Sequence, residues 1–184
     1  PVPLIRTMLH ELHHVLRWDG PGYGRSLGEA LVSEGLAGHF VQQVLGGAPD
    51  PWDQTPPTAG LAKRAITEWA RRDYDHALWF QGRGNLRKWA GYGLAHRLLA
   101  DHLDANPGET AVTLAHVPAE TLRPAMRRLS GSDFPEEPAD APGNAPPAEP
   151  DQGRERDAAK VEPSAPAPAS EPGLGPAAEP GTTP

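Results

Sequence analysis

The last fifty residues of the chain cannot build a folded core, so they confine the fold to the residues before them. Residues 135–184 hold 13 of the 23 prolines, consist mostly of Pro, Ala, Glu and Gly, and contain no aromatic residue. Such a segment cannot bury enough apolar surface to offset the entropy lost on ordering. We therefore predict a folded domain over residues 1–130 and a disordered tail over residues 131–184, which we interpret as a solvated linker or terminal extension.

The tail also carries the net charge of the chain. Residues 135–184 hold ten acidic and three basic residues, and their net charge of −7 equals that of the whole chain. The remainder is neutral and gives no electrostatic basis for binding nucleic acid or an anionic membrane. No apolar run is long enough to span a bilayer. The absence of cysteine excludes disulfides, thiolate metal ligands and a cysteine nucleophile.

The start of the sequence predicts that this chain is a fragment of a longer protein. It begins at Pro1 without Met and enters a strong helical pattern within three residues. Any targeting segment would then precede it, so the compartment stays open, with the cytoplasm as the favoured expectation.

Hydrophobic periodicity predicts an all-α domain, a compact helical bundle. Helices are expected over residues 3–18, 27–45, 59–72 and 87–104, with short helices within 109–129 and an irregular segment at 73–86. Ser26 and Glu29 have capping-box spacing at the start of the second helix, and Gly46 and Gly47 follow its end. No run of alternating β-branched residues predicts a strand.

The first predicted helix carries an HExxH pattern, His10-Glu-Leu-His-His14. Side chains four residues apart project from nearly the same helical face, so the two imidazoles can bind one metal ion. Glu11 is turned aside by about 100° and can reach a water at that metal without being a ligand. The apolar residues of this helix form one arc opposite His10 and His14: Leu4, Ile5, Met8, Leu9, Leu12, Val15 and Leu16. The alternative is an exposed polar face that matches the short pattern by chance.

The second helix offers a third ligand, because Glu34 lies in the middle of an apolar arc. A carboxylate in that place is costly unless it is paired or bound to a cation. Two His and one Glu with an open fourth position form a known catalytic zinc arrangement. We therefore predict one Zn²⁺ per chain, held by His10, His14 and Glu34. The alternative is a buried ion pair of Glu34 with Arg17 or Arg97. Four further histidines are interpreted as surface residues: His13, His39, His76 and His102.

Two residues of the fourth predicted helix are candidates for stabilising the oxyanion of a hydrolytic reaction. Tyr92 and His96 are four residues apart and share a stripe with Trp89, Leu99 and Leu103, which predicts that both face inward. We expect one of them to point at the zinc. The alternative is that both are core residues with hydrogen-bond partners elsewhere.

Three motifs together resemble a bacterial family of unknown function described as predicted zinc-dependent proteases. The motifs are His10-Glu-Leu-His-His14, Ser33-Glu-Gly-Leu-Ala37 and Trp89-Ala-Gly-Tyr-Gly93, and the resemblance covers most of residues 4–125. That family is similar to the gluzincins, peptidases with two His ligands from HExxH and a downstream Glu. The resemblance implies that the two motif histidines and Glu34 are zinc ligands, that Glu11 is the general base, and that the substrate is a peptide or protein.

The chain departs from the gluzincin pattern in two places. Gluzincins place a β-sheet before the metal helix, whereas this chain starts at that helix and would be the C-terminal part of such a domain. Thermolysin-like members also carry an Asp one turn after the ligand Glu, and it orients a ligand His. Here that position is Gly38, so a different partner is expected for the His.

Two functions of other classes stay open on the sequence. Glu11-x-x-His14 and Asp73-x-x-His76 match, the second imperfectly, the Glu-x-x-His motif of di-iron carboxylate bundles. A helical binding module that keeps zinc for stability alone would also explain the ligand set.

Overall fold

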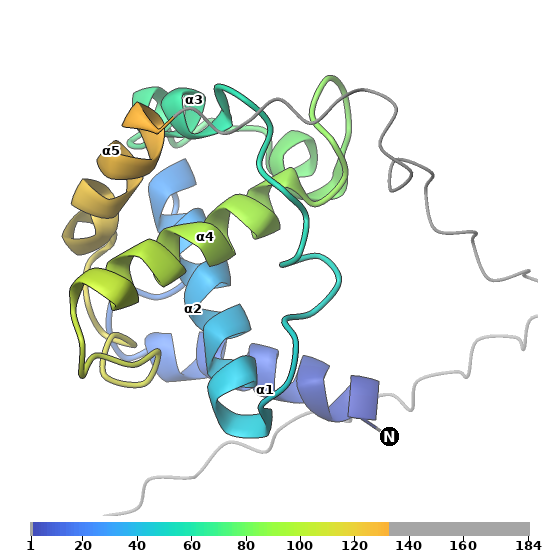
Figure 1. Cartoon of the computed structure of the whole chain (residues 1–184), viewed down its shortest axis with the longest axis vertical. Coiled ribbons are helices and arrows are strands. Elements are labelled where there is room, and N and C mark those ends of the chain that lie inside the picture. The colour runs from blue at the N-terminus through green and yellow to red at the C-terminus, as the bar shows by residue number, and fades with distance from the viewer. Residues whose placement is uncertain (1, 133–184) are drawn as a thin grey trace, which may run out of the picture. The chain divides into compact units, whose positions relative to one another are not determined.

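The computed structural model describes residues 2–132, whose regular secondary structure is entirely helical (Figure 1). The predicted fold class is confirmed, and no strand occurs among the described residues. The elements are α1 (Val2–Arg17), α2 (Leu27–Leu45), α3 (Leu61–Glu68), the π-helix η1 (Ala77–Gln81), α4 (Ala90–Ala105), the 3₁₀-helix η2 (Ala119–Leu122) and α5 (Arg123–Gly131). In this part of the chain no helix is long and apolar enough to cross a membrane. Beyond Ser132, the predicted tail lies outside the described residues.

Helix α2 forms the centre of the domain. The predicted capping box starts it, because Ser26 Oγ accepts the Glu29 N–H while the Glu29 carboxylate accepts the Ser26 N–H. Every residue from 27 to 41 except Glu29 is buried. Helix α4 crosses α2 (Figure 1), and a Cβ at Gly35 would lie 2.4 Å from the Ala95 carbonyl oxygen. The absence of a side chain at Gly35 therefore allows this close crossing.

Helix α1 packs against α2 (Figure 1), and the face of α1 that is buried is its polar one. Its buried residues are His10, His13 and Arg17. Most of the apolar arc seen in the sequence is exposed instead: Leu4, Ile5, Met8, Leu12, Val15 and Leu16. An amphipathic helix usually turns its apolar stripe toward the core, and α1 does the reverse.

Hydrogen bonds from buried polar side chains hold α1 in this orientation. Arg17 donates to the Ala115 carbonyl at 2.8 Å and to the Gly22 carbonyl at 3.2 Å. His13 Nε2 lies 3.0 Å from the Ala111 carbonyl, and its ring packs against Phe40. Burial lowers the pKa of His13 to about 4, so its ring is neutral and Nε2 donates this hydrogen bond. The prediction that His13 is a surface residue is therefore wrong.

Two helix boundaries differ from the prediction. The third helix is shorter than expected, since α3 ends at Glu68 and the Trp69 side chain turns into the core, where Nε1 donates to Glu120. The fourth begins at Ala90 rather than near residue 87, because Trp89 has a φ of +67°, which a continuous helix excludes. Between them, the segment expected to be irregular contains the π-helix η1.

Candidate metal centre

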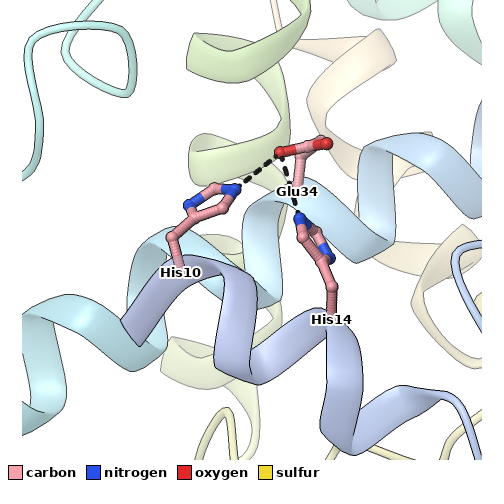
Figure 2. Close-up of side chains that lie close together, drawn as sticks. All are labelled: His10, His14 and Glu34. Carbon is pink, nitrogen blue, oxygen red and sulfur yellow. Dashed lines mark hydrogen bonds and ion pairs between the residues drawn. The ribbon is translucent and has the colours of Figure 1, made fainter. Parts of the chain in front are cut away.

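Three predicted ligands converge between α1 and α2 (Figure 2). His10 Nε2 lies 3.0 Å, and His14 Nε2 lies 3.7 Å, from the same oxygen of Glu34, Oε2. The two imidazole rings meet edge to face with their centroids 4.8 Å apart. Among the described residues, this is the single group of three His, Asp or Glu side chains placed to hold one metal ion.

The local sequence explains this convergence. The spacing of four residues in α1 directs both imidazoles toward α2, as Figure 2 shows. A short turn returns the chain to α2, and Gly22 and Gly24 adopt positive φ values of +66° and +92° in it. Glu34 then lies inside the buried part of α2 and faces the histidines, with only 5% of its surface exposed.

The cluster fixes the charge of Glu34. Burial alone would raise the pKa of this carboxyl, but hydrogen bonds and charge interactions with His10 and His14 hold it down to about 2. Burial would lower the pKa of His10, whereas the hydrogen bond and the charge of Glu34 raise it above its ordinary value. The alternative partners of Glu34, Arg17 and Arg97, do not pair with it: Arg17 binds backbone carbonyls, and the partners of Glu34 are His10, His14 and Tyr23.

The donor set fits zinc. In a tetrahedral site with bonds of about 2.0–2.1 Å, two ligand atoms are separated by about 3.3 Å. The 3.0 Å and 3.7 Å distances from Glu34 to the two histidines bracket that value. Two imidazoles and one carboxylate are a ligand set that zinc takes in catalytic sites, where it leaves the fourth position free for a small molecule.

An open pocket of about 770 Å³ lies against the cluster. Glu11 and Tyr92 are on its wall, together with both histidines and Glu34. None of its remaining lining residues was predicted to belong to the zinc site: Val15, Trp18, Tyr23 and His76. The pocket therefore brings the HExxH glutamate to the same space as the candidate ligands.

Tyr23 is a site residue that the sequence analysis missed. Its hydroxyl donates to Glu34 Oε1 at 2.7 Å, and its ring packs edge-on against His14. This hydrogen bond occupies the Glu34 oxygen that does not face the histidines, so it fixes the rotation of the carboxylate. Burial and the nearby charge of Glu34 raise the pKa of Tyr23 far above its ordinary value, so it remains a donor. The sequence feature that could have identified Tyr23 is its position as a single Tyr in the short Gly-rich turn between the two helices that carry the candidate ligands.

His76 is half-buried and also lies on the pocket wall. It directly precedes the π-helix η1, a rare element that is frequent at functional sites. Its Nδ1 lies 3.3 Å from the Tyr74 hydroxyl, and its ring stacks on Phe80. These contacts fix the ring.

The structure separates Tyr92 from His96. Tyr92 lines the pocket and packs edge-on against Phe80. His96 is not on the pocket wall; its ring stacks on His39 at 4.1 Å, and its Nε2 lies 3.3 Å from Gln42 Oε1. His39 and His102, expected at the surface, are both buried.

The second half of the di-iron motif does not join the cluster. Asp73 is largely exposed and forms an ion pair with Arg71 at 3.0 Å. Within residues 2–132, the convergent ligands form a set for one ion, with no second group of ligands beside it.

Comparison with known families gives one match. Residues 3–123 match the family described as Predicted Zn-dependent protease (DUF2268). The chain belongs to this family. The match contains every ligand of the cluster and supports zinc as its metal and a peptide as its substrate class. No curated protein and no solved structure matches the chain.

Proposed function

We propose that this domain hydrolyses peptide bonds with one zinc ion held by His10, His14 and Glu34. The observation that carries the proposal is the convergence of these three side chains on one wall of an open pocket that also contains Glu11. Zinc sites that serve stability alone are usually closed by four protein ligands. Such a site would need neither an open pocket nor a free carboxylate beside the metal, such as that of Glu11. When bound, zinc supplies a Lewis acid that polarises the scissile carbonyl and acidifies a water.

Glu11 is the proposed general base. It follows His10 directly, so it leaves the ligand face of α1 but still lines the pocket. Its carboxylate would take a proton from the attacking water and deliver it to the nitrogen of the leaving amine. Both transfers occur at the same carboxylate, so Glu11 ends the cycle ionised, as it began.

Tyr92 is the proposed donor to the oxyanion. Burial and nearby carboxylates raise its pKa, so the phenol keeps its proton and can donate at neutral pH. His76 lies on the same pocket wall and is a second candidate for this role. We do not extend the role to His96, because it stacks on His39 away from the pocket lining.

Elemental analysis of the wild type beside Glu34→Ala tests the metal centre. We expect about one zinc per chain in the wild type and none in the variant. Asp104→Ala, an exposed carboxylate on α4, is the control and should retain the metal. A wild type without zinc, or a variant that keeps it, would refute the proposed ligand set.

Glu11→Gln tests catalysis separately from zinc binding. With a quenched fluorescent peptide mixture as substrate, we expect this variant to keep zinc and the fold but to lose hydrolysis. Tyr92→Phe should lower kcat about 100-fold, while His96→Ala should leave it unchanged. Hydrolysis that persists in Glu11→Gln would exclude its role as base, and a zinc-loaded wild type without hydrolysis would favour the structural zinc module.

A further inference from the structure

The loop between α2 and α3 is held to α1, the helix that carries the two candidate ligand histidines. Arg6, one turn before His10, donates to the Asp50 carboxylate at 2.5 Å and to the Ala48 carbonyl at 3.1 Å. The Asp50 carbonyl in turn accepts the Asp53 N–H at 2.9 Å, which closes a tight turn. This turn fixes where the Asp53 side chain points.

Two glycines make room for this loop. A Cβ at Gly93 of α4 would lie 1.8 Å from the Thr55 carbonyl oxygen, and a Cβ at Gly38 of α2 would lie 2.6 Å from Asp53 Oδ2. Gly38 is one turn after the ligand Glu34. The carboxylate of Asp53 therefore occupies the space that a side chain at position 38 would fill.

Asp53 and His10 both carry buried polar atoms without a hydrogen-bond partner. Asp53 is 5% exposed, and neither of its carboxylate oxygens has a hydrogen-bond partner. His10 turns Nε2 toward Glu34, and its other nitrogen, Nδ1, is also buried without a partner. A buried carboxylate without a hydrogen bond is costly, which indicates that it has a role beyond packing.

Asp53 lies against Gly38, one turn from Glu34, and Glu34 in turn contacts His10. After burial and the effects of Glu34, the charge of Asp53 is the next contribution that raises the pKa of His10. Burial, together with the charges of Asp50 and Glu34, raises the pKa of Asp53 to about 7, while His10 and Arg6 act in the opposite direction. Among the charged groups that influence the pKa of Asp53, His10 has a buried ring nitrogen without a partner, which could form a hydrogen bond to a carboxylate.

We propose that Asp53 is the positioning residue for the ligand His10, accepting the proton of Nδ1 directly or through one water when Nε2 binds the metal. The inference rests on the proposed zinc function. A ligand histidine usually donates its second N–H to a carboxylate or carbonyl, which fixes its tautomer and raises its basicity. Asp53 would supply this carboxylate from a loop, across Gly38, instead of from α2 itself.

Zinc affinity of Asp53→Asn, measured by competition with a chelator, tests the proposal. We expect binding about 10–100-fold weaker than in the wild type, with the melting temperature of the zinc-free variant unchanged or raised, because a costly buried carboxylate is gone. Asp104→Asn is the matched control and should bind zinc as the wild type does. A purely structural role predicts the opposite pattern: a lower melting temperature and an affinity within twofold of the wild type, which would overturn the proposal.

A measurement on the wild type keeps the test decisive if the variant does not fold. In the zinc-loaded protein, imidazole nitrogen–proton correlation spectra should show a protected Nδ1 proton on His10, identified by its loss in His10→Gln. Its absence would overturn the inference. Loss of zinc in Glu34→Ala with unchanged affinity in Asp53→Asn would refute the role of Asp53 alone, whereas a wild type that binds no zinc would refute the metal centre first.

Discussion

Helices α1 and α2 supply the two halves of the candidate metal centre, yet they are held in the domain in different ways. Helix α2 is buried on nearly all sides, and its contacts are mostly apolar, including Leu31 and Leu36. Helix α1 turns its polar face inward and leaves Leu4 and Met8 exposed. The hydrophobic effect therefore stabilises α2 directly, whereas α1 depends on specific hydrogen bonds and on the ligand cluster.

This difference assigns different tasks to the two helices. Because α2 cannot move without opening the core, Glu34 is a fixed reference point for the centre. Helix α1 carries both histidines and the proposed base, and few apolar contacts fix its position. A metal ion bound by ligands from both helices would tie α1 to α2, and so stabilise the helix that has few apolar contacts.

The largest expected effect is on the α2 side of this comparison. Leu36→Ala removes a fully buried side chain, and we expect a loss of about 2–5 kcal/mol in the free energy of unfolding. Val44→Ala, at the exposed end of the same helix, is the control and should change stability by less than about 0.5 kcal/mol. Urea denaturation measures both. Similar values for the two variants would show that α2 is not packed as described.

Zinc should act mainly on α1. At a free zinc concentration 100 times the dissociation constant, binding adds about 2.7 kcal/mol to stability. Because the ion would join α1 to α2, we expect added zinc to slow hydrogen exchange at the amides of residues 2–17 more than at the amides of α5. His14→Ala should abolish both effects. An equal increase in protection of α1 and α5 on adding zinc would contradict the view that α1 is the weakly held helix.

Arg17 tests whether polar contacts hold α1. Arg17→Met keeps the apolar stem but leaves the carbonyls of Ala115 and Gly22 without their donor. An unsatisfied buried acceptor costs about 1–3 kcal/mol, so we expect a loss of about 2 kcal/mol in unfolding free energy. Lys63→Met, at an exposed site on α3, should have almost no effect. A neutral Arg17→Met would mean that α1 is held by other contacts.

The convergence of the candidate ligands could be expected from the sequence because their signals are local. The spacing of His10 and His14 follows from helix geometry, and a carboxylate within the apolar arc of α2 marks Glu34 as needing a partner. The capping box that starts α2 is equally local and is present as predicted. These features depend on the repeat of a single helix and not on how the helices pack.

The sequence could not predict the features that depend on packing between distant segments. The orientation of α1 follows from hydrogen bonds to Ala111 and Ala115, about a hundred residues further along the chain. Hydrophobic periodicity identifies the apolar and the polar face of a helix. It does not show which face is buried when the polar face can form hydrogen bonds with the rest of the domain. The same limit hid the place of His76 on the pocket wall, because this residue lies in the segment before η1 and not on a periodic helix.

Acid should destabilise the domain through its buried histidines, which include His13 and the stacked pair of His39 and His96. Burial lowers the pKa of His96 to about 4, and the pKa of His39 is also lowered by burial. As the pH falls below about 6.5, the unfolded chain takes up protons before the folded one, so stability is lost until about pH 4. For His96 the loss between pH 7 and pH 5 is on the order of 1–2 kcal/mol. His96→Gln should flatten the pH dependence of the unfolding free energy, and His116→Gln, at an exposed site, should not.

The smallest expected effect is the one most able to break the comparison. Met8→Gln and Leu12→Gln lie on the exposed apolar face of α1, so each should change the free energy of unfolding by less than about 0.5 kcal/mol. Leu9, on the same helix, packs against the core, and Leu9→Gln should cost clearly more in the same urea titration. If Met8→Gln and Leu12→Gln cost as much as Leu9→Gln, the apolar face of α1 is covered in solution. In that case α1 would be held by the hydrophobic effect on its outer side, and the contrast with α2 would disappear.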